Sequence, residues 1–134
     1  MNRYCLSVFL VAFTVVGVVL SAPEKSFEEY LEILRKVNVD DVFKNDRLVK
    51  SYVDCFTGSK TCTVEGAALK AIWNKILDID GFEEDKRKVK KAIKHLYVDH
   101  RSWYDEVQDK LPKDEEFRNK YKKYFDAILK DDTL

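Results

Sequence analysis

The sequence lacks an excess of charge of either sign. It contains 24 Lys and Arg residues and 24 Asp and Glu residues, so its formal net charge is zero. Proteins that bind nucleic acids usually carry a basic excess that is gathered on one face. Because no such excess exists here, the composition argues against a nucleic-acid partner.

Recognisable catalytic motifs are also missing. The sequence has no HExxH, no glycine-rich phosphate loop and no G-x-S-x-G elbow. Its two histidines, His95 and His100, are five positions apart, which would set them about 140° apart around one continuous helix. Without a third ligand nearby in the sequence they make a poor metal site, and we interpret both as surface residues. We therefore expect no enzymatic activity, no metal and no cofactor.

Strand patterns are absent as well, because no alternation of apolar and polar residues lies between turn residues. There are no internal repeats, low-complexity tracts or long linkers. Apolar residues recur instead at spacings of three and four, which is typical of amphipathic helices. Six or seven short helices of this kind, none able to bury its apolar stripe alone, predict a single small all-α globule.

The N-terminal residues have the layout of a secretory signal peptide. Arg3 supplies a positive start, residues 6–20 are mostly apolar, and the small residues Ser21 and Ala22 follow. The apolar run falls short of the roughly 20 residues needed to span a bilayer. We therefore predict a signal peptide over residues 1–22, no stable membrane insertion after its removal, and a secreted, extracellular protein.

Cysteines are few. The sequence has three cysteines, and Cys5 lies in the expected signal peptide, so Cys55 and Cys62 remain. In an oxidising compartment this even number predicts one disulfide. In an unbroken helix the two Cα atoms would be about 10 Å apart, too far for a disulfide, so the helix must end between them. Gly58 can adopt the left-handed conformation that ends a helix, and the pair would then fix a corner between two helices.

Capping residues and apolar stripes locate the helices and divide the chain. We expect residues 23–38 to be an N-terminal extension with a helix of its own, residues 39–130 a helical domain, and residues 131–134 a tail. The first four expected helices are residues 27–36 after Ser26, one or two turns around 42–43 after Asn38, a stripe over 48–56 after Asn45, and residues 69–77 after Thr63. The last three are residues 89–97 after the acidic residues 83–85, residues 103–111 after Ser102, and residues 117–129 after Asp114.

Aromatic residues raise the question of whether the core is filled or hollow. Many of them fall on the apolar stripes, which a packed core explains well for any single residue. Five tyrosines bring phenol groups that need hydrogen-bond partners when buried: Tyr52, Tyr97, Tyr104, Tyr121 and Tyr124. A cavity that holds an amphiphilic ligand would meet both needs. The residues alone leave both alternatives open.

Several short motifs resemble the first half of the insect chemosensory protein family, also called OS-D-like. They are Asn45-Asp46-Arg47-Leu48, Tyr52-Val53-Asp54-Cys55, Cys62-Thr63 and Glu65-Gly66. Phe117-Arg118-Asn119-Lys120-Tyr121 is similar to the family's closing motif, and the resemblance extends over about residues 39–125. It implies a secreted protein that folds as six helices around an apolar channel for long-chain or aromatic small molecules.

The resemblance also implies roles for individual residues. Tyr52 matches the family tyrosine beside the channel, and Cys55 and Cys62 match its first disulfide. A family tryptophan that precedes the penultimate helix aligns with Tyr104, next to Trp103. The second cysteine pair of the family is missing, and the corresponding loop at residues 79–84 is about three residues shorter. We therefore predict that this loop opens more readily than in relatives with four cysteines.

Two hypotheses of function follow. The first is a monomeric secreted carrier that binds and solubilises small hydrophobic ligands, such as long-chain lipids or odorant- and pheromone-like molecules, without catalysis. The alternative is a secreted interaction, developmental or immune-response factor with a filled core, which presents the lysine-rich segment 86–94 or the helix near Phe27 to a receptor or other protein partner. The residues expected to contact the ligand are Leu48, Tyr52, Val53, Leu69, Ile72, Trp73, Ile76, Val89, Ile93, Tyr97, Trp103, Tyr104, Val107 and Tyr121.

Overall fold

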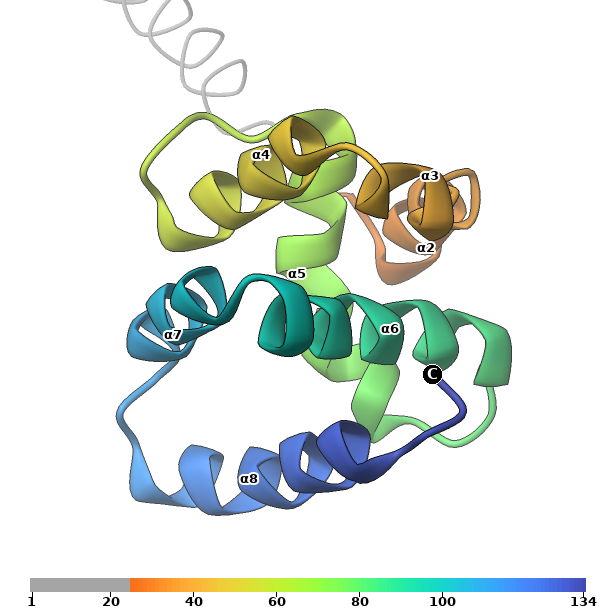
Figure 1. The fold of residues 1–134 in the computed structure, drawn as a ribbon. Helices are drawn as coiled ribbons and strands as arrows, with labels where there is room; N and C mark the ends of the chain where they lie inside the picture. Colours follow the sequence, from red (N-terminus) through yellow and green to blue (C-terminus); the bar gives the residue numbers. More distant parts are fainter. Residues whose placement is uncertain (1–24) are drawn as a thin grey trace, which may run out of the picture.

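The computed structural model describes residues 25–134, and within them it contains seven α-helices and no strand. The all-α prediction is confirmed. The expected signal peptide at residues 1–22 lies outside the described residues. The helices, labelled as in Figure 1, are α2 (Phe27–Arg35), α3 (Val39–Phe43), α4 (Asp46–Thr57), α5 (Val64–Asp78), α6 (Glu83–Asp99), α7 (Arg101–Lys110) and α8 (Glu115–Lys130).

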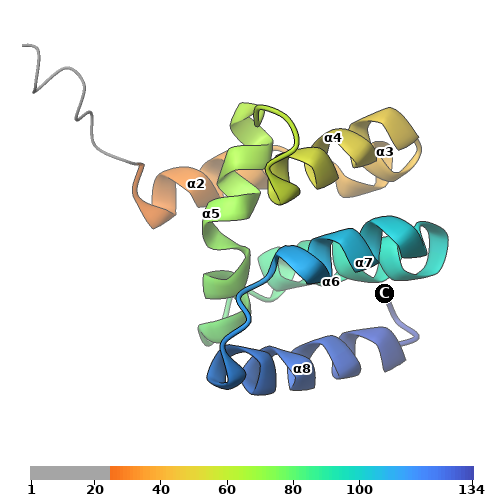
Figure 2. The same ribbon diagram turned by 90° about the vertical axis from the view of Figure 1, so that its left-hand side faces the viewer.

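Helix α5 is the element around which the other helices are arranged. Figures 1 and 2 show three tiers, one formed by α2, α3 and α4, one by α6 and α7, and one by α8, with α5 running across all three. The side chains of Ile72 and Ile76 on α5 are each 1% exposed. The buried residues of α5 face the other helices, while positions such as Ala71, Lys75 and Asp78 remain exposed along one side.

The predicted caps explain where most helices begin. Side chains of four predicted capping residues accept hydrogen bonds from backbone N–H groups in the first turn of the helix that follows; these residues are Ser26, Asn38, Asn45 and Thr63. Asp114 does the same for α8. Ser102 was wrongly predicted as a cap, because α6 and α7 are separated by a single residue, His100, and α7 already begins at Arg101.

A disulfide joins the end of α4 to the segment before α5, as predicted. Cys55 and Cys62 are bonded, with their Cα atoms 4.6 Å apart. Gly58 ends α4 with a φ of 82°, in the left-handed region that favours glycine. A Cβ atom on Gly66 would lie 3.1 Å from the Cys55 Sγ, so glycine allows α5 to pass close to the bridge. A loop this short contributes about 2 to 3 kcal/mol in the chain-entropy model.

Candidate functional site

An apolar cavity of about 150 Å³ lies between the helices. Each of the seven described helices contributes to its wall, which is made mainly of Leu, Val, Ile and Phe side chains. Drug-sized ligands usually occupy pockets of about 300 to 1,000 Å³, whereas an apolar cavity of about 150 Å³ can hold one aromatic ring. In the structure as it stands, the cavity therefore suits a molecule of about that size.

The structure brings nine of the fourteen residues that we expected to contact a ligand together on the cavity wall. They come from α4, α5, α6 and α7, so the stripes predicted on these helices do converge. Their contact with a ligand stays a prediction. The nine are Tyr52, Val53, Leu69, Trp73, Ile76, Val89, Ile93, Tyr104 and Val107.

The other five lie outside this cavity. Leu48 is 45% exposed, and Ile72 is enclosed by the packed core, at 1% exposure. Tyr97 is covered by the Arg101 guanidinium, which lies 3.4 Å from the centre of its ring. Trp103 stacks on His100 with ring centres 4.0 Å apart. Leu48 thus faces solvent, and the other three side chains pack against other parts of the protein, which helical spacing alone does not reveal.

Tyr121, the fifth of these residues, belongs to the core between α5 and α8. It is 4% exposed, and its hydroxyl donates a hydrogen bond of 2.8 Å to the carboxylate of Asp78. Burial and this hydrogen bond raise the pKa of Tyr121 to about 12. The phenol that we expected to face a ligand is satisfied instead by a side chain of the protein.

The raised pKa of Tyr121 predicts a loss of stability at alkaline pH. The unfolded chain ionises a tyrosine near pH 10, so the contribution from Tyr121 is fully present below pH 10 and is lost as the pH rises towards 12. Tyr121→Phe should therefore flatten the fall in the free energy of unfolding over this range, as measured by urea denaturation at pH 9, 10 and 11. Equal slopes for Tyr121→Phe and wild type would contradict the prediction.

The cavity wall also includes residues that the sequence analysis did not select. Several come from α2 and α3, whose apolar residues were visible in the sequence. The sequence analysis assigned α2 to an N-terminal extension and α3 to a helix of one or two turns, and it selected no ligand contacts from either. The remaining wall residues are Leu31, Leu34, Val37, Val39, Val42, Phe43, Val49, Phe56, Asp85, Lys88, Ala92, His95, Leu96, Gln108, Leu111 and Phe125.

Charged groups at the edge of the cavity are already paired. Asp85 accepts two hydrogen bonds from the Arg35 guanidinium, at 3.3 and 3.1 Å. The Lys88 ammonium donates to the backbone carbonyls of Leu34, Arg35 and Val37 at the end of α2. Cations in this position complement the partial negative charge of a helix C-terminus. These contacts tie α2 to α6 and leave no unpaired charge from these residues facing the apolar space.

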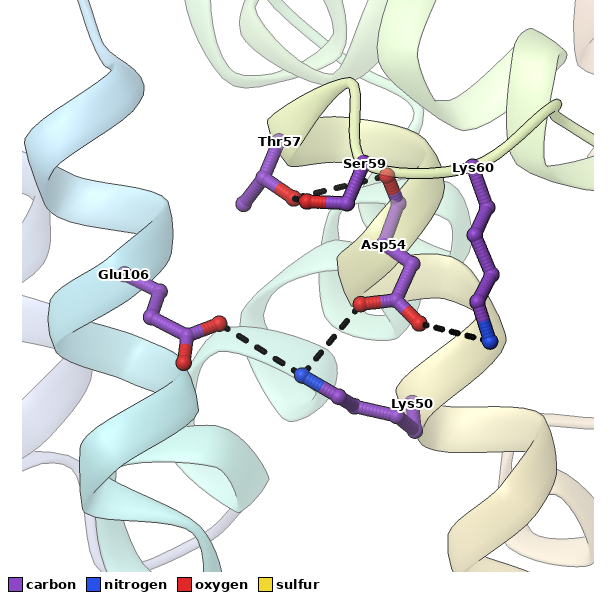
Figure 3. Close-up of polar contacts among 6 residues, drawn as sticks. All are labelled: Lys50, Asp54, Thr57, Ser59, Lys60 and Glu106. Atoms are coloured by element: carbon purple, nitrogen blue, oxygen red, sulfur yellow. Dashed lines mark hydrogen bonds and ion pairs between the residues drawn. The ribbon is translucent and has the colours of Figure 1, made fainter.

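An ionic cluster lies between α4 and α7, outside the wall of the apolar cavity. The carboxylate of Asp54, a residue 5% exposed, lies 3.2 Å from the Lys50 ammonium and 3.7 Å from that of Lys60. Lys50 also lies 3.5 Å from the Glu106 carboxylate on α7 (Figure 3). Lys50 thus bridges a carboxylate on each helix, but because Lys50 and Glu106 are substantially exposed, their contact contributes little to the packing of α7.

The two histidines contradict our interpretation of them as separate surface residues. Their side chains are only 14% and 16% exposed, and their ring centres lie 5.3 Å apart. The calculated separation assumed one helix, but α6 ends at Asp99 and the chain turns at His100. The His95 ring also stacks on Phe43 of α3, with ring centres 4.2 Å apart.

Each histidine has a carboxylate partner. His95 Nδ1 lies 3.0 Å from Asp99, and His100 Nε2 lies 3.2 Å from Asp46 at the start of α4. Burial lowers the pKa of His95, although Asp99 acts in the opposite direction. His95 is therefore neutral at pH 7. Within residues 25–134, no group of three or more His, Cys, Asp and Glu side chains is placed to hold a metal ion.

Comparison with known families identifies the chain. Residues 30–119, from α2 into α8, match the insect pheromone-binding family, A10/OS-D. The chain belongs to this family. The A10/OS-D resemblance seen in the sequence motifs is thus confirmed, and the matched region includes most of the cavity wall.

Two relatives are similar to this A10/OS-D chain over most of its length. Ejaculatory bulb-specific protein 3 of Drosophila melanogaster is 27% identical over 116 residues, which cover 84% of this chain and 90% of the relative. The allergen Tha p 1 of Thaumetopoea pityocampa is 21% identical over 126 residues, which cover 92% and 98% of the two chains. No solved structure matches the chain.

Membership in the A10/OS-D family indicates a small binding protein of the carrier type. In the part of the chain that the structure describes, no helix has both the length and the apolar character needed to cross a bilayer.

Proposed function

We propose that the protein is a secreted, monomeric carrier that binds a small hydrophobic molecule in the cavity and performs no catalysis. The observation that carries this proposal is the apolar cavity, to whose wall each of the seven described helices contributes. Burial of apolar surface gains roughly 25 cal/mol per Å², so a ligand needs few polar contacts to bind. The family description, pheromone binding, supports the same class of ligand.

The cavity volume sets the size of the ligands that bind most readily. At about 150 Å³ the space suits one aromatic ring or a short chain without rearrangement. A long-chain lipid would have to displace side chains of the wall. We therefore propose odorant- or pheromone-like molecules of one ring or a short chain as the ligands that fit directly, and longer chains as ligands that bind with a change in wall packing.

The alternative, a factor with a filled core and a protein partner, receives less support. The lysine-rich segment 86–94 was one of its two candidate surfaces, beside the helix near Phe27, but three of these lysines are engaged within the protein. Lys88 caps α2, Lys91 lies 3.5 Å from Asp40, and Lys94 donates to the backbone carbonyl of Asp131. The cavity, which a filled core would not contain, favours the carrier.

Filling the cavity should abolish ligand binding. An uncharged environment-sensitive aromatic dye should give a saturable signal at micromolar protein, and short alcohols and esters should displace it. Ala92 lines the cavity on α6, so Ala92→Trp should occupy the space and weaken dye binding by at least about tenfold, the loss of roughly 1.4 kcal/mol of binding energy. Fluorescence titration measures the change.

Ala127→Trp provides a matched control, because it adds the same side chain at an exposed position of α8. It should bind the dye like the wild type. Absence of a saturable signal in the wild type, or equal binding by both variants, would count against the carrier and would direct attention to a protein partner.

A further inference from the structure

His95 is the one buried side chain in residues 25–134 with a polar atom that lacks a hydrogen-bond partner there. That atom is Nε2, which exposes less than 1 Å². The His95 ring lines the cavity. Buried polar atoms are nearly always paired in folded proteins, so an unpaired nitrogen in a ring that lines an apolar cavity suggests a partner that enters the cavity and displaces neighbouring side chains to reach it.

The partner of Nδ1 decides which hydrogen-bonding role is left to Nε2. The ring is neutral at pH 7, and its Nδ1 lies 3.0 Å from the Asp99 carboxylate. A carboxylate can only accept hydrogen bonds, so this close contact favours the tautomer that carries its proton on Nδ1. In that tautomer Nε2 has a free lone pair and can only accept.

We propose that His95 Nε2 recognises the head group of the ligand and that the cavity selects an apolar molecule with one hydrogen-bond donor, an alcohol or a phenol. This inference rests on the proposed carrier function and adds the chemical class of the ligand. A hydrocarbon, an ether or an ester has no proton to donate to Nε2. A carboxylate also lacks one, and burial opposes the protonated imidazole that would receive it.

The surroundings of the ring keep it in this role. Phe43 of α3 stacks on one face and holds its orientation. The titratable groups closest to it are Asp99 on its own helix, His100 at the junction with α7, and Asp46 at the start of α4, which pairs with His100. Asp99 is thus the direct partner of His95, and Asp46 is already engaged with the other histidine.

Phenol and toluene test the proposal, because they have nearly the same shape and differ by a hydroxyl in place of a methyl group. The quantity to measure is the Kd of toluene divided by the Kd of phenol, obtained by displacement of the dye. His95→Phe keeps a ring on Phe43 but removes the nitrogen, and it should lower this ratio by about threefold to tenfold, the value of one net hydrogen bond. His100→Phe changes the neighbouring ring outside the cavity wall and should leave the ratio within twofold of the wild type.

A second readout uses the wild-type protein and so does not depend on the folding of any variant. In ¹⁵N NMR spectra of the imidazoles, phenol should shift the Nε2 resonance of His95 and toluene should not. A ratio that is equal in wild type and His95→Phe, or a phenol preference that persists without the nitrogen, would overturn the proposal. If the dye itself gives no saturable signal, the carrier function fails; if the dye binds but neither compound displaces it, or both displace it and the ratio does not change, only the role of His95 is refuted.

Discussion

Trp73→Ala should lower the free energy of unfolding by about 3 to 5 kcal/mol, the range for removing a large buried aromatic side chain. Trp73 is 9% exposed and separates the cavity from the core. Its ring centre lies 5.5 Å from that of Tyr121, 6.0 Å from Phe56 and 6.1 Å from Phe125. Because domains of this kind are stable by only about 5 to 15 kcal/mol, the variant should lose a large part of its stability.

Trp103→Ala is the matched control for this measurement. Trp103 lies near the surface, stacked on His100 with the Lys50 ammonium 5.3 Å from its ring centre. Its removal should cost about 1 kcal/mol. Urea denaturation followed by circular dichroism compares the two variants without relying on tryptophan fluorescence. A loss below 1 kcal/mol for Trp73→Ala would contradict the central position that the structure gives this ring.

Indole should restore part of the stability that Trp73→Ala loses. The substitution removes an indole group next to an existing cavity, so the enlarged space includes the volume that the missing group occupied. A ligand that binds only the folded state stabilises it by about 1.4 kcal/mol at ten times its Kd. The same concentration of indole should have a smaller effect on Trp103→Ala, where the lost ring leaves an open surface.

Capping residues and the spacing of apolar residues predicted most of the helices, because both depend only on residues that are close together in the sequence. The side-chain oxygens of Ser26, Asn45 and Thr63 each satisfy backbone N–H groups that no other part of the helix can reach. The break between the two helices was predicted, but it was placed at Ser102 instead of His100, because no capping side chain marks the actual turn. The angle between the histidines was calculated for one continuous helix, although a break lies between them.

The cavity wall was harder to predict because spacing gives the face of a helix but not what that face contacts. Tyr104 and Tyr97 both lie on apolar stripes, yet the first lines the cavity and the second packs under Arg101. The choice depends on how α6 and α7 approach each other, which is a property of the tertiary structure. Residues of α2 and α3 were overlooked for the opposite reason, since a sequence does not show that a terminal helix folds back onto the core.

Helix α2 takes part in holding the loop that lacks the second cysteine pair of the family. Phe27 packs edge to face against Phe82 in this loop, with ring centres 6.2 Å apart. The Arg35 guanidinium lies 5.9 Å from the Phe82 ring centre and pairs with Asp85 just beyond it. Because Arg35 and Phe82 are largely exposed, these contacts are individually weak, and the attachment depends on the anchoring of α2 itself.

Leu31→Ala should release this attachment. Leu31 is 3% exposed and joins α2 to the core cluster, so its truncation should cost about 2 to 5 kcal/mol. We expect amide hydrogen exchange at residues 79–84 to accelerate together with that of α2, and to do so more than exchange in α8. The loop would then open locally, as predicted from the missing cysteine pair.

Val53→Ala separates local opening from a general loss of stability. Val53 is 2% exposed on α4, and it lines the same cavity without belonging to α2. Its truncation should destabilise the whole protein. It should not, however, accelerate amide hydrogen exchange at residues 79–84 more than exchange in the neighbouring helices, because the opening of each unit is governed by the contacts of that unit. If Leu31→Ala leaves the loop as protected as α5 and α6, the loop is held by its own backbone, and α2 does not take the place of the missing disulfide.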